Sequence, residues 1–548
     1  MRLTDGNLNV SWECGSAFIS FITNMSRDEW VDAVRRVRIN SYVANRAAIH
    51  FLPKYPAINF PRLLNQLTLY QVLSKSTIAA VDSVSAVSHP DLILGICCMS
   101  VLLVGMDVTI VNVALPAIQY DLRATLSGLQ WILDAYTLVV ASLLMLAGSL
   151  SDRFGRRRVF QIGLTLFIAG SVLCSLAHSI HQLVTFRAMQ GLGASMLNPV
   201  ALSIIANASP EPKARGRAVG IWGGVAGVSM ALGPLLGGAL TESVGWRSIF
   251  WINLPIGLAA VALAARYVPE SKAARARAFD PVGQLMVFIG LASLTYAVIE
   301  GPHAGWTSPL ILILFATTAI ASVVFLLYEP RRKEPMVELR FFRSVPFSTA
   351  ALLGVAAFSC FAGFLFLNAL YLQQVRGLSA FQTGLCSLPL AVMMMLCSPF
   401  SGRLVGRYGT RPSLLAAGAG FLLSTLLVTG LTTSTPIALV MASYLLFGIG
   451  LGMVNPAISN NAVAGMPLAQ AGVAAAIAST ARQVGAALGV AIAGTVVSAS
   501  HAQGIDYTRA THPIWWIMTG CGAFILLLGW LSSTAWAKAT TRRVPSLV

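Results

Sequence analysis

Long apolar runs, separated by short polar segments, follow one another along most of the chain. Each run has the length of about 20 residues that an α-helix needs to cross the hydrocarbon core of a membrane. Fourteen such runs are present, and each boundary is set to within about 2–4 residues. They lie at 92–113, 131–150, 159–177, 182–206, 218–240, 249–267, 281–299, 309–328, 347–372, 384–404, 412–431, 436–458, 472–498 and 514–536. Because the number is even, we expect both ends of the chain on the same side of the membrane.

The composition agrees with this pattern. Of the 548 residues, 56% are hydrophobic and only 10% are charged. A soluble protein of this size needs far more charge to cover its surface, so the sequence predicts an all-α polytopic membrane protein. The eight cysteines include no CxxC pair, which argues against a disulfide framework or a metal clip.

The net charge of +17 suggests at first a nucleic-acid partner, but the positions of the basic residues favour another explanation. With the N-terminus in the cytoplasm, the predicted cytoplasmic connections carry 22 Lys or Arg residues and the opposite connections carry four. Such an excess on cytoplasmic loops is the usual topology signal of membrane proteins. We therefore expect a multi-pass protein of the cytoplasmic (inner) membrane, with both termini cytoplasmic and no nucleic-acid partner.

Two sequence patterns occur twice. GSLSDRFGRR (148–157) resembles GRLVGRYGTR (402–411) at an offset of 254 residues, and GLGASMLNP (191–199) resembles GIGLGMVNP (448–456) at an offset of 257. Matches in the same order at nearly one offset predict two six-helix bundles in pseudo-twofold repeat, with two additional helices between them. Parallel repeats of this kind place a substrate site between the halves, near the bilayer midplane.

The chain then divides into a cytoplasmic extension, a first bundle, two inserted helices, a second bundle and a tail, at 1–90, 91–267, 268–345, 346–536 and 537–548. Two interpretations of the extension stay open. Trp30, Val34 and Val37 share a face of a helix that would lie on the membrane surface, or the true start lies downstream of this segment. The basic tail is expected to be disordered.

Few charged residues fall inside the predicted helices. Asp107, Asp134, Arg187 and Arg482 do so clearly. A charge at that depth costs at least a few kcal/mol, so it is expected to face protein or a water-filled interior. Burial raises the pKa of a carboxyl group and a nearby Arg lowers it, so such a group can exchange a proton as its surroundings alternate. The alternative is that these residues form buried ion pairs that hold helices together.

The sequence contains no P-loop, no GxSxG and no nucleophile beside a base. No histidine lies near the middle of a predicted span, and we expect neither a metal site nor a bound cofactor. ATP-driven transport by this chain alone and hydrolysis within the membrane are therefore disfavoured. We expect a protein that is not an enzyme.

Four motifs together resemble the fourteen-helix drug:proton antiporters of the major facilitator superfamily. They are MDVTIVNVALP (106–116), GSLSDRFGRRR (148–158), RAMQGLGASMLNP (187–199) and a spaced set in the fifth run. That set comprises Gly220, Ser229, Gly233, Pro234, Gly237 and Gly238, with serine where the family usually has glycine. The likeness covers roughly residues 90–540.

This resemblance implies a proton-coupled antiporter, driven by the proton gradient, that exports lipophilic drugs or toxic compounds by alternating access. Its partners would be small lipophilic substrates, protons and the lipid bilayer. We expect a monomer, with or without a periplasmic adaptor and an outer-membrane channel. In the family, the position of Arg187 serves proton transfer, and the packing of the fifth helix prevents leakage.

The loop motif implies a conformational latch formed by Gly148, Asp152, Arg153, Gly155, Arg156 and Arg157. Gly148 and Gly155 would permit a tight reversal between two helices. Asp152 would attract the positive N-terminal end of a helix in the other half and hold the outward-closed arrangement. Gly406 replaces this aspartate in the second copy, so the latch would exist once.

Apart from the boundary before its first helix, the second half has one acidic residue, Asp506, in a loop. This disfavours dicationic substrates and favours neutral or monocationic ones. Three other functions stay open: export of one natural product (an antibiotic, siderophore or lipid precursor), proton-coupled import, and sensing without transport. The motif of the fifth run disfavours import, and no additional domain supports sensing.

Overall fold

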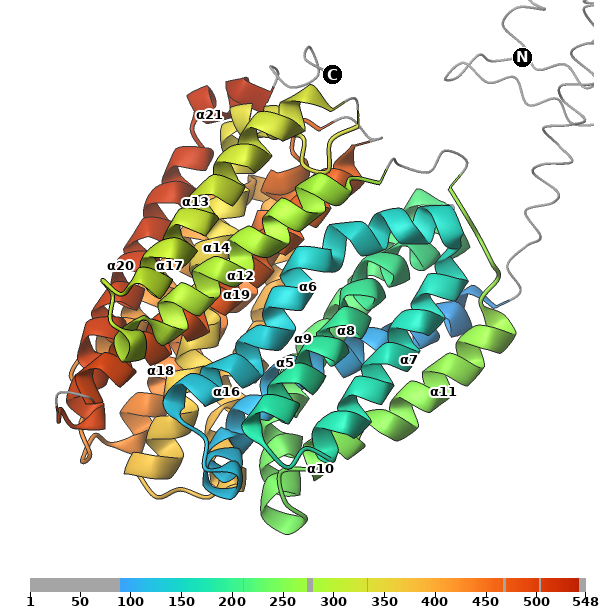
Figure 1. Cartoon of the computed structure of the whole chain (residues 1–548). Helices are drawn as coiled ribbons and strands as arrows, with labels where there is room; N and C mark the ends of the chain where they lie inside the picture. The colour runs from blue at the N-terminus through green and yellow to red at the C-terminus, as the bar shows by residue number, and fades with distance from the viewer. Residues whose placement is uncertain are drawn as a thin grey trace, which may run out of the picture. The chain divides into compact units, whose positions relative to one another are not determined.

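The computed structural model describes residues 89–209, 211–273, 279–332, 334–466, 470–501 and 504–541 (Figure 1). The predicted surface helix near Trp30 and the question of the true start lie outside the described residues. Within them, the chain forms helices joined by short connections, and no strand is present.

The first half contains six membrane-length segments. They are α5 (Pro90–Leu122), α6 (Leu126–Phe154), α7 (Arg156–Ser175), α8 (Ile180–Ala208), α9 (Pro212–Ser243) and the consecutive pair α10 (Ser248–Trp251) and α11 (Asn253–Tyr267).

The inserted helices are α12 (Pro281–Ala304) and α13 (Pro309–Tyr328). The second half comprises α14 (Val345–Leu370) with a π-helical turn at Tyr371–Val375, α15 (Ala380–Cys386), α16 (Leu388–Tyr408), α17 (Thr410–Leu427), α18 (Ile437–Val463), α19 (Ala471–His501) and α20 (Tyr507–Ser532). Thirteen helical segments among the described residues are long and apolar enough to cross a membrane. The predicted run at 412–431 is not among these thirteen; it forms α17, which has 18 residues and starts on the polar Thr410 and Arg411.

The two halves repeat the same packing. In the first, α5 packs against α9, α8 packs against both α6 and α7, and α7 packs against α11. In the second, α14 packs against α19, α18 packs against both α16 and α17, and α17 packs against α20. Each of these pairs occupies the equivalent place in its half, which confirms the predicted architecture of two six-helix bundles.

The halves meet along two seams and at one central contact. One seam runs between α6 and α19, the other between α9 and the α15–α16 segment, and α5 touches α14 at the centre. Gln130 of α6 bridges the first seam, because its side-chain amide donates to the Ala491 carbonyl of α19 at 2.8 Å. Gly494 of α19 lies against this glutamine, because a Cβ atom at that position would overlap the Gln130 side chain.

The inserted helix α12 covers one of these seams. It packs against both α6 and α19, while α13 packs on α12. Trp131 of α6 donates to Glu300 of α12 at 3.0 Å, and Thr495 of α19 donates to the Val298 carbonyl at 2.6 Å. Side chains of α13, such as Ile313 and Ile320, stay more than half exposed, as expected for a helix that faces lipid.

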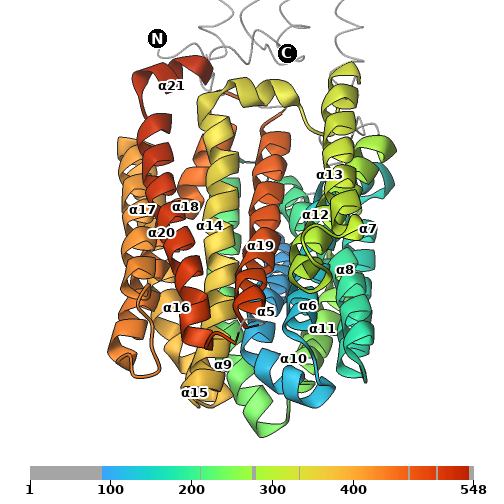
Figure 2. The ribbon, with the colours of Figure 1, turned by 60° about the vertical axis from the view of Figure 1, so that its left-hand side comes forward.

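The halves touch closely at the end of the bundle where α9 ends and α15 begins, which we call the α15 end (Figure 2). There the Gln373 side chain donates to the Val113 carbonyl at 2.8 Å, and the Phe381 backbone amide donates to Glu242 at 3.1 Å. The opposite end carries α21 (Ala535–Thr540) and is called the α21 end. Toward it, the N-terminal part of α9 is mostly exposed, and a Cβ atom on Gly220 of α9 or Gly406 of α16 would meet no atom within 4 Å.

The tail differs from the expectation of disorder. Thr534 caps α21 by accepting a hydrogen bond from the Ala537 amide at 3.2 Å. Thr540 is buried, and its hydroxyl accepts a hydrogen bond from the Val345 amide at 2.9 Å, so the helix is tied to the start of α14. No local pattern predicts this contact, because the run is too short to show a periodicity. Residues 542–548 lie outside the described residues.

Candidate functional site

A buried ion pair joins two of the charged residues predicted from sequence. Arg187 of α8 donates to the Asp107 carboxylate of α5 at 2.7 Å, and both side chains are 1% exposed or less. Gln190 closes a ring, because its amide donates to Asp107 at 2.8 Å and its carbonyl oxygen accepts from Arg187 at 2.8 Å. Each charged group therefore has a partner, as buried charges require.

The surroundings of Arg187 belong to the first half. Its Nε–H donates to the Ile132 carbonyl of α6 at 3.2 Å, and its guanidinium carbon lies 4.3 Å from the centre of the Tyr136 ring. The Tyr136 hydroxyl is buried and has no hydrogen-bond partner among the described residues. Gln190 was missed by the sequence reasoning, although its spacing of three residues from Arg187 puts both on one helix face.

Asp134 of α6 stands apart from this ring. It is fully buried, and neither carboxyl oxygen has a hydrogen-bond partner within the described part of the chain. A buried polar group in this condition is rare and calls for an explanation.

Arg482 of α19 is not brought to either carboxylate. Its guanidinium carbon lies 5.9 Å from the centre of the Phe358 ring of α14, and its backbone packs near Gly354. No ion pair involves it in the described ranges. The predicted coupling group of the second half is therefore separate from the Asp107–Arg187 pair.

A central cavity lies between the two halves. It has an empty volume of about 250 Å³, part of it open to its surroundings, and no residue that lines it is charged.

 The lining of this central cavity comes from α5, α9, α14, α15 and α18, together with the residue just before α16. The lining residues are Thr109, Asn112, Val113, Pro234, Leu365, Ala369, Thr383, Ser387 and Tyr444. The lining is thus apolar with a few uncharged polar groups, as is usual for sites that take small molecules.

The motif of the fifth run forms the face of α9 that packs on α5. A Cβ atom on Gly233 would lie 2.0 Å from the Thr109 hydroxyl, and one on Gly237 would lie 2.8 Å from the Ile110 carbonyl oxygen. Ser229 packs where Gly105 of α5 leaves room for its hydroxyl. These positions need small residues because the two helix backbones approach closely.

Two further members of this motif face the second half. A Cβ atom on Gly238 would lie 2.4 Å from the Ala380 carbonyl oxygen of α15, and the Pro234 carbonyl oxygen would lie 2.4 Å from a Cβ atom on Gly384. Gly220, by contrast, contacts nothing within 4 Å of its Cβ position. One end of the motif therefore packs at the contact between halves, and the other end has open space at its Cβ position.

The loop motif is folded differently from the expectation. Gly155 has a φ of 115° and makes the reversal between α6 and α7, but Gly148 lies inside α6, which continues to Phe154. Asp152 pairs with Arg156 at 3.2 Å within its own half. Among the described residues, the Asp152 side chain makes no hydrogen bond or ion pair with a helix of the other half, and the latch stays a prediction.

A different carboxylate occupies the helix N-terminus. Glu270, in the segment after α11, accepts hydrogen bonds from the backbone amides of Arg157 at 3.1 Å and Arg158 at 3.3 Å. These amides open α7, where a negative charge is stabilising. Arg153 is exposed, with its guanidinium carbon 5.9 Å from the centre of the Phe154 ring. The sequence reasoning missed Glu270 because 113 residues separate it from Arg157.

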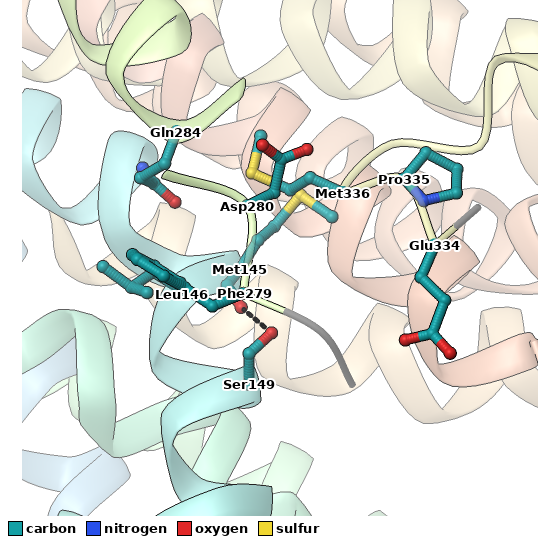
Figure 3. Close-up of a pocket in the computed structure, with 9 residues that line it drawn as sticks. All are labelled: Met145, Leu146, Ser149, Phe279, Asp280, Gln284, Glu334, Pro335 and Met336. Carbon is teal, nitrogen blue, oxygen red and sulfur yellow. Dashed lines mark hydrogen bonds between the residues drawn. The ribbon is translucent and has the colours of Figure 1, made fainter. Parts of the chain in front are cut away.

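The second cavity lies at the α21 end and has an empty volume of about 400 Å³ (Figure 3). It is lined by Met145, Leu146, Ser149, Phe279, Asp280, Gln284, Glu334, Pro335 and Met336. Asp280 caps α12 by accepting from the Gly283 amide at 2.9 Å, and its other oxygen lies 3.7 Å from Arg332. Its carboxylate therefore serves the start of α12, and the central cavity is the better candidate for a transport site.

Comparison with known proteins agrees with this architecture. The family described as Major Facilitator Superfamily matches residues 97–490. The multidrug resistance protein Stp of Mycobacterium tuberculosis (strain H37Rv) is 39% identical over 401 residues, which are 73% of this chain and 74% of that protein. The tetracenomycin C resistance and export protein of Streptomyces glaucescens is 36% identical over 404 residues, with 73% and 74% covered. The multidrug efflux pump LfrA of Mycolicibacterium smegmatis is 33% identical over 424 residues, with 77% and 83% covered.

Solved structures share the fold at low sequence identity. The D-xylose–proton symporter matches with a TM-score of 0.59 and 18% identity, covering 81% of this chain and 98% of that chain. The human organic anion transporter MFSD10 matches with a TM-score of 0.54 and 16% identity, covering 80% and 99%. The family match, the curated relatives and the repeated helix packing lead to one conclusion. The chain belongs to the major facilitator superfamily.

Proposed function

We propose that this protein exports lipophilic, neutral or monocationic compounds across the cytoplasmic membrane in exchange for protons. The observation that carries the proposal is the position of Asp107. Asp107 pairs with Arg187 of α8 and lies on α5, the helix that also supplies Thr109 and Asn112 to the central cavity. A change of protonation at Asp107 would therefore act on a helix that lines the cavity.

Because Asp107 belongs to a buried ion pair, its protonation would change the free energy of this arrangement strongly. Removing one charge of a buried pair leaves the other uncompensated, which costs about 3–5 kcal/mol. Protonation of Asp107 would thus release Arg187 and favour an arrangement in which the guanidinium finds other partners. A ligand shifts two conformations only through such a difference in free energy, and the proton supplies it here.

Asp134 would be a second residue that binds and releases a proton during the transport cycle. Its carboxyl group is buried with no hydrogen-bond partner among the described residues, a setting in which an unpaired charge is costly. We infer that Asp134 carries its proton in this arrangement and loses it when movement of α6 opens the site to water. Asp107 and Asp134 would then hold different protonation states at one stage of the cycle.

The charge pattern of the loops favours the outside for the α15 end and the cytoplasm for the α21 end. With this orientation the halves contact each other toward the outside, through Gly238 and Gln373, and the Cβ positions of Gly220 and Gly406 have open space toward the cytoplasm. The names of the relatives, which include multidrug resistance and efflux proteins, support export as the direction.

A transport assay tests the proposal. The full chain would be reconstituted in liposomes with an imposed pH gradient, and a panel of lipophilic compounds would be followed with and without a protonophore. We expect several unrelated compounds to move against their gradients while the pH gradient lasts. Movement that ignores the protonophore would contradict proton coupling, and movement of one compound alone would favour a dedicated exporter.

A further inference from the structure

Three of the four hydroxyl groups that line the central cavity donate their protons to backbone carbonyl groups. The Thr383 hydroxyl donates to the Ser379 carbonyl at 2.9 Å, and the Ser387 hydroxyl donates to the Gly384 carbonyl at 2.6 Å. The Thr109 hydroxyl lies 3.3 Å from the Met106 carbonyl oxygen. Because a hydroxyl has one proton and two lone pairs, these three groups are left with acceptor capacity alone.

Asn112 adds a fourth acceptor. Its side-chain nitrogen donates to the Val108 carbonyl at 3.1 Å, and this contact fixes which of its terminal atoms is the oxygen. The remaining oxygen is buried and has no hydrogen-bond partner among the described residues, while the side chain is only 6% exposed. A buried acceptor without a partner is costly, and it is expected to find one when the cavity is filled.

Donors are scarce in the same lining. Tyr444 supplies the one side-chain hydroxyl of the nine lining residues that makes no hydrogen bond within the described part of the chain. No carboxylate lines the cavity, and the nearby Asp107 is engaged by Arg187 and Gln190. The cavity therefore offers several acceptors, one adaptable hydroxyl and no counter-charge for a cation.

We propose that the central cavity selects lipophilic, uncharged molecules that carry hydroxyl or N–H donors, such as phenols, over analogues without donors and over cations without N–H groups. This inference rests on the proposed function and narrows its substrate class. A site built to hydrogen-bond a ligand discriminates against an analogue that lacks the group, because its own polar atoms are then left unpaired. For one such donor we expect a difference in affinity of about tenfold.

The test uses flat aromatic probes of similar size: 1-hydroxypyrene, its methyl ether 1-methoxypyrene, and the N-methylacridinium cation. Binding to the purified full chain in detergent would be measured through protein fluorescence. We expect 1-hydroxypyrene to bind about tenfold more tightly than the ether, and the cation to bind no better than the ether. The Asn112→Leu and Thr383→Val variants should bring the ratio of hydroxyl to ether affinity toward one.

A matched control is available in α14. Asn368 also donates to the carbonyl four residues earlier, at 2.9 Å, and its oxygen is also buried without a partner, but it does not line the cavity. Asn368→Leu should therefore keep the affinity ratio of the unmodified protein. Equal binding of 1-hydroxypyrene and its ether, or a ratio that survives in both cavity variants, would overturn the inference and leave proton-coupled export intact. Failure of every compound to be transported in the liposome assay would overturn the proposed function and this inference with it.

Discussion

Gly238 of α9 lies against the backbone of α15 at the α15 end, where the two halves touch. A methyl group at this position would place its carbon 2.4 Å from the Ala380 carbonyl oxygen and 2.8 Å from the Phe381 Cα atom. Ordinary contacts begin near 3.4 Å, so α15 would have to move by about 1 Å. Backbone atoms cannot rotate away as the end of a side chain can, and the change Gly238→Ala therefore acts on the contact between the halves.

The size of the effect follows from the cost of overpacking, which is typically about 1–3 kcal/mol. The arrangement that separates the halves at the α15 end relieves this strain, so the variant should favour it. A difference of this size changes the ratio of two conformations by about 5- to 150-fold. Gly220→Ala is the matched control, because the same motif places Gly220 where an added methyl group meets nothing within 4 Å.

The assay is a distance measurement by pulsed electron spin resonance on the full chain, with its native cysteines replaced. Labels at Val244 and Thr433 report on the α15 end, since both residues are exposed and belong to different halves. Labels at Phe154 and Tyr408 report on the α21 end. We expect Gly238→Ala to lengthen the first distance and shorten the second, and Gly220→Ala to leave both unchanged. Unchanged distances in a folded Gly238→Ala protein would refute the idea that this contact seals the α15 end.

Three other variants test separate parts of the site. Asp107→Asn should abolish proton-coupled efflux and proton release on substrate addition. Asp121→Asn is the control, because Asp121 also lies on α5 but forms an exposed ion pair with Arg247, and it should retain both activities. Coupled efflux by Asp107→Asn would exclude Asp107 as the proton group. Glu270→Gln should lower the melting temperature by about 1 °C or less, because a carboxylate at a helix N-terminus contributes about 0.3–1 kcal/mol. Glu338→Gln is the control, since that carboxylate is similarly exposed and makes no helix-cap hydrogen bond. A melting temperature of Glu270→Gln no lower than that of the control would show that the charge at α7 is unimportant. Asp152→Asn should impair transport more than Arg411→Gln when both variants are expressed at the same level. The reason is that Gly406 leaves the second loop without a carboxylate equivalent to Asp152. Equal transport activities of the two variants would show that no latch operates at Asp152.

The fold was largely predictable because its signals are local or repeated. Apolar runs and loop charges are read directly along the chain, and the two pairs of repeated patterns already imply two equivalent halves. The site was predictable only in part. Asp107 and Arg187 are conspicuous as charges in apolar runs, but no local pattern shows that they contact each other across 80 residues.

The residues that were missed have partners far away in the sequence. Gln190 is an unremarked polar residue until Asp107 lies beside it, and Glu270 looks like a linker acid until α7 begins next to it. Arg482 shows the reverse case, because a charge in an apolar run suggested coupling, whereas its guanidinium lies near the Phe358 ring and forms no ion pair among the described residues. Gly148 and Gly155 look alike in the motif, and only the continuation of α6 to Phe154 separates their roles.

The inserted helix α12 makes the two seams unequal toward the lipid. The repeat by itself would give two lateral entrances of the same kind, one beside α6 and α19 and the other beside α9 and α16. Because α12 packs on both α6 and α19, a molecule dissolved in the bilayer meets a helix on that side. On the other side neither inserted helix packs on α9 or α16, and a Cβ atom on Gly220 would meet no atom of the described chain within 4 Å. A protein built from two equivalent halves thus presents two different flanks to the membrane, and only one of them is covered by α12.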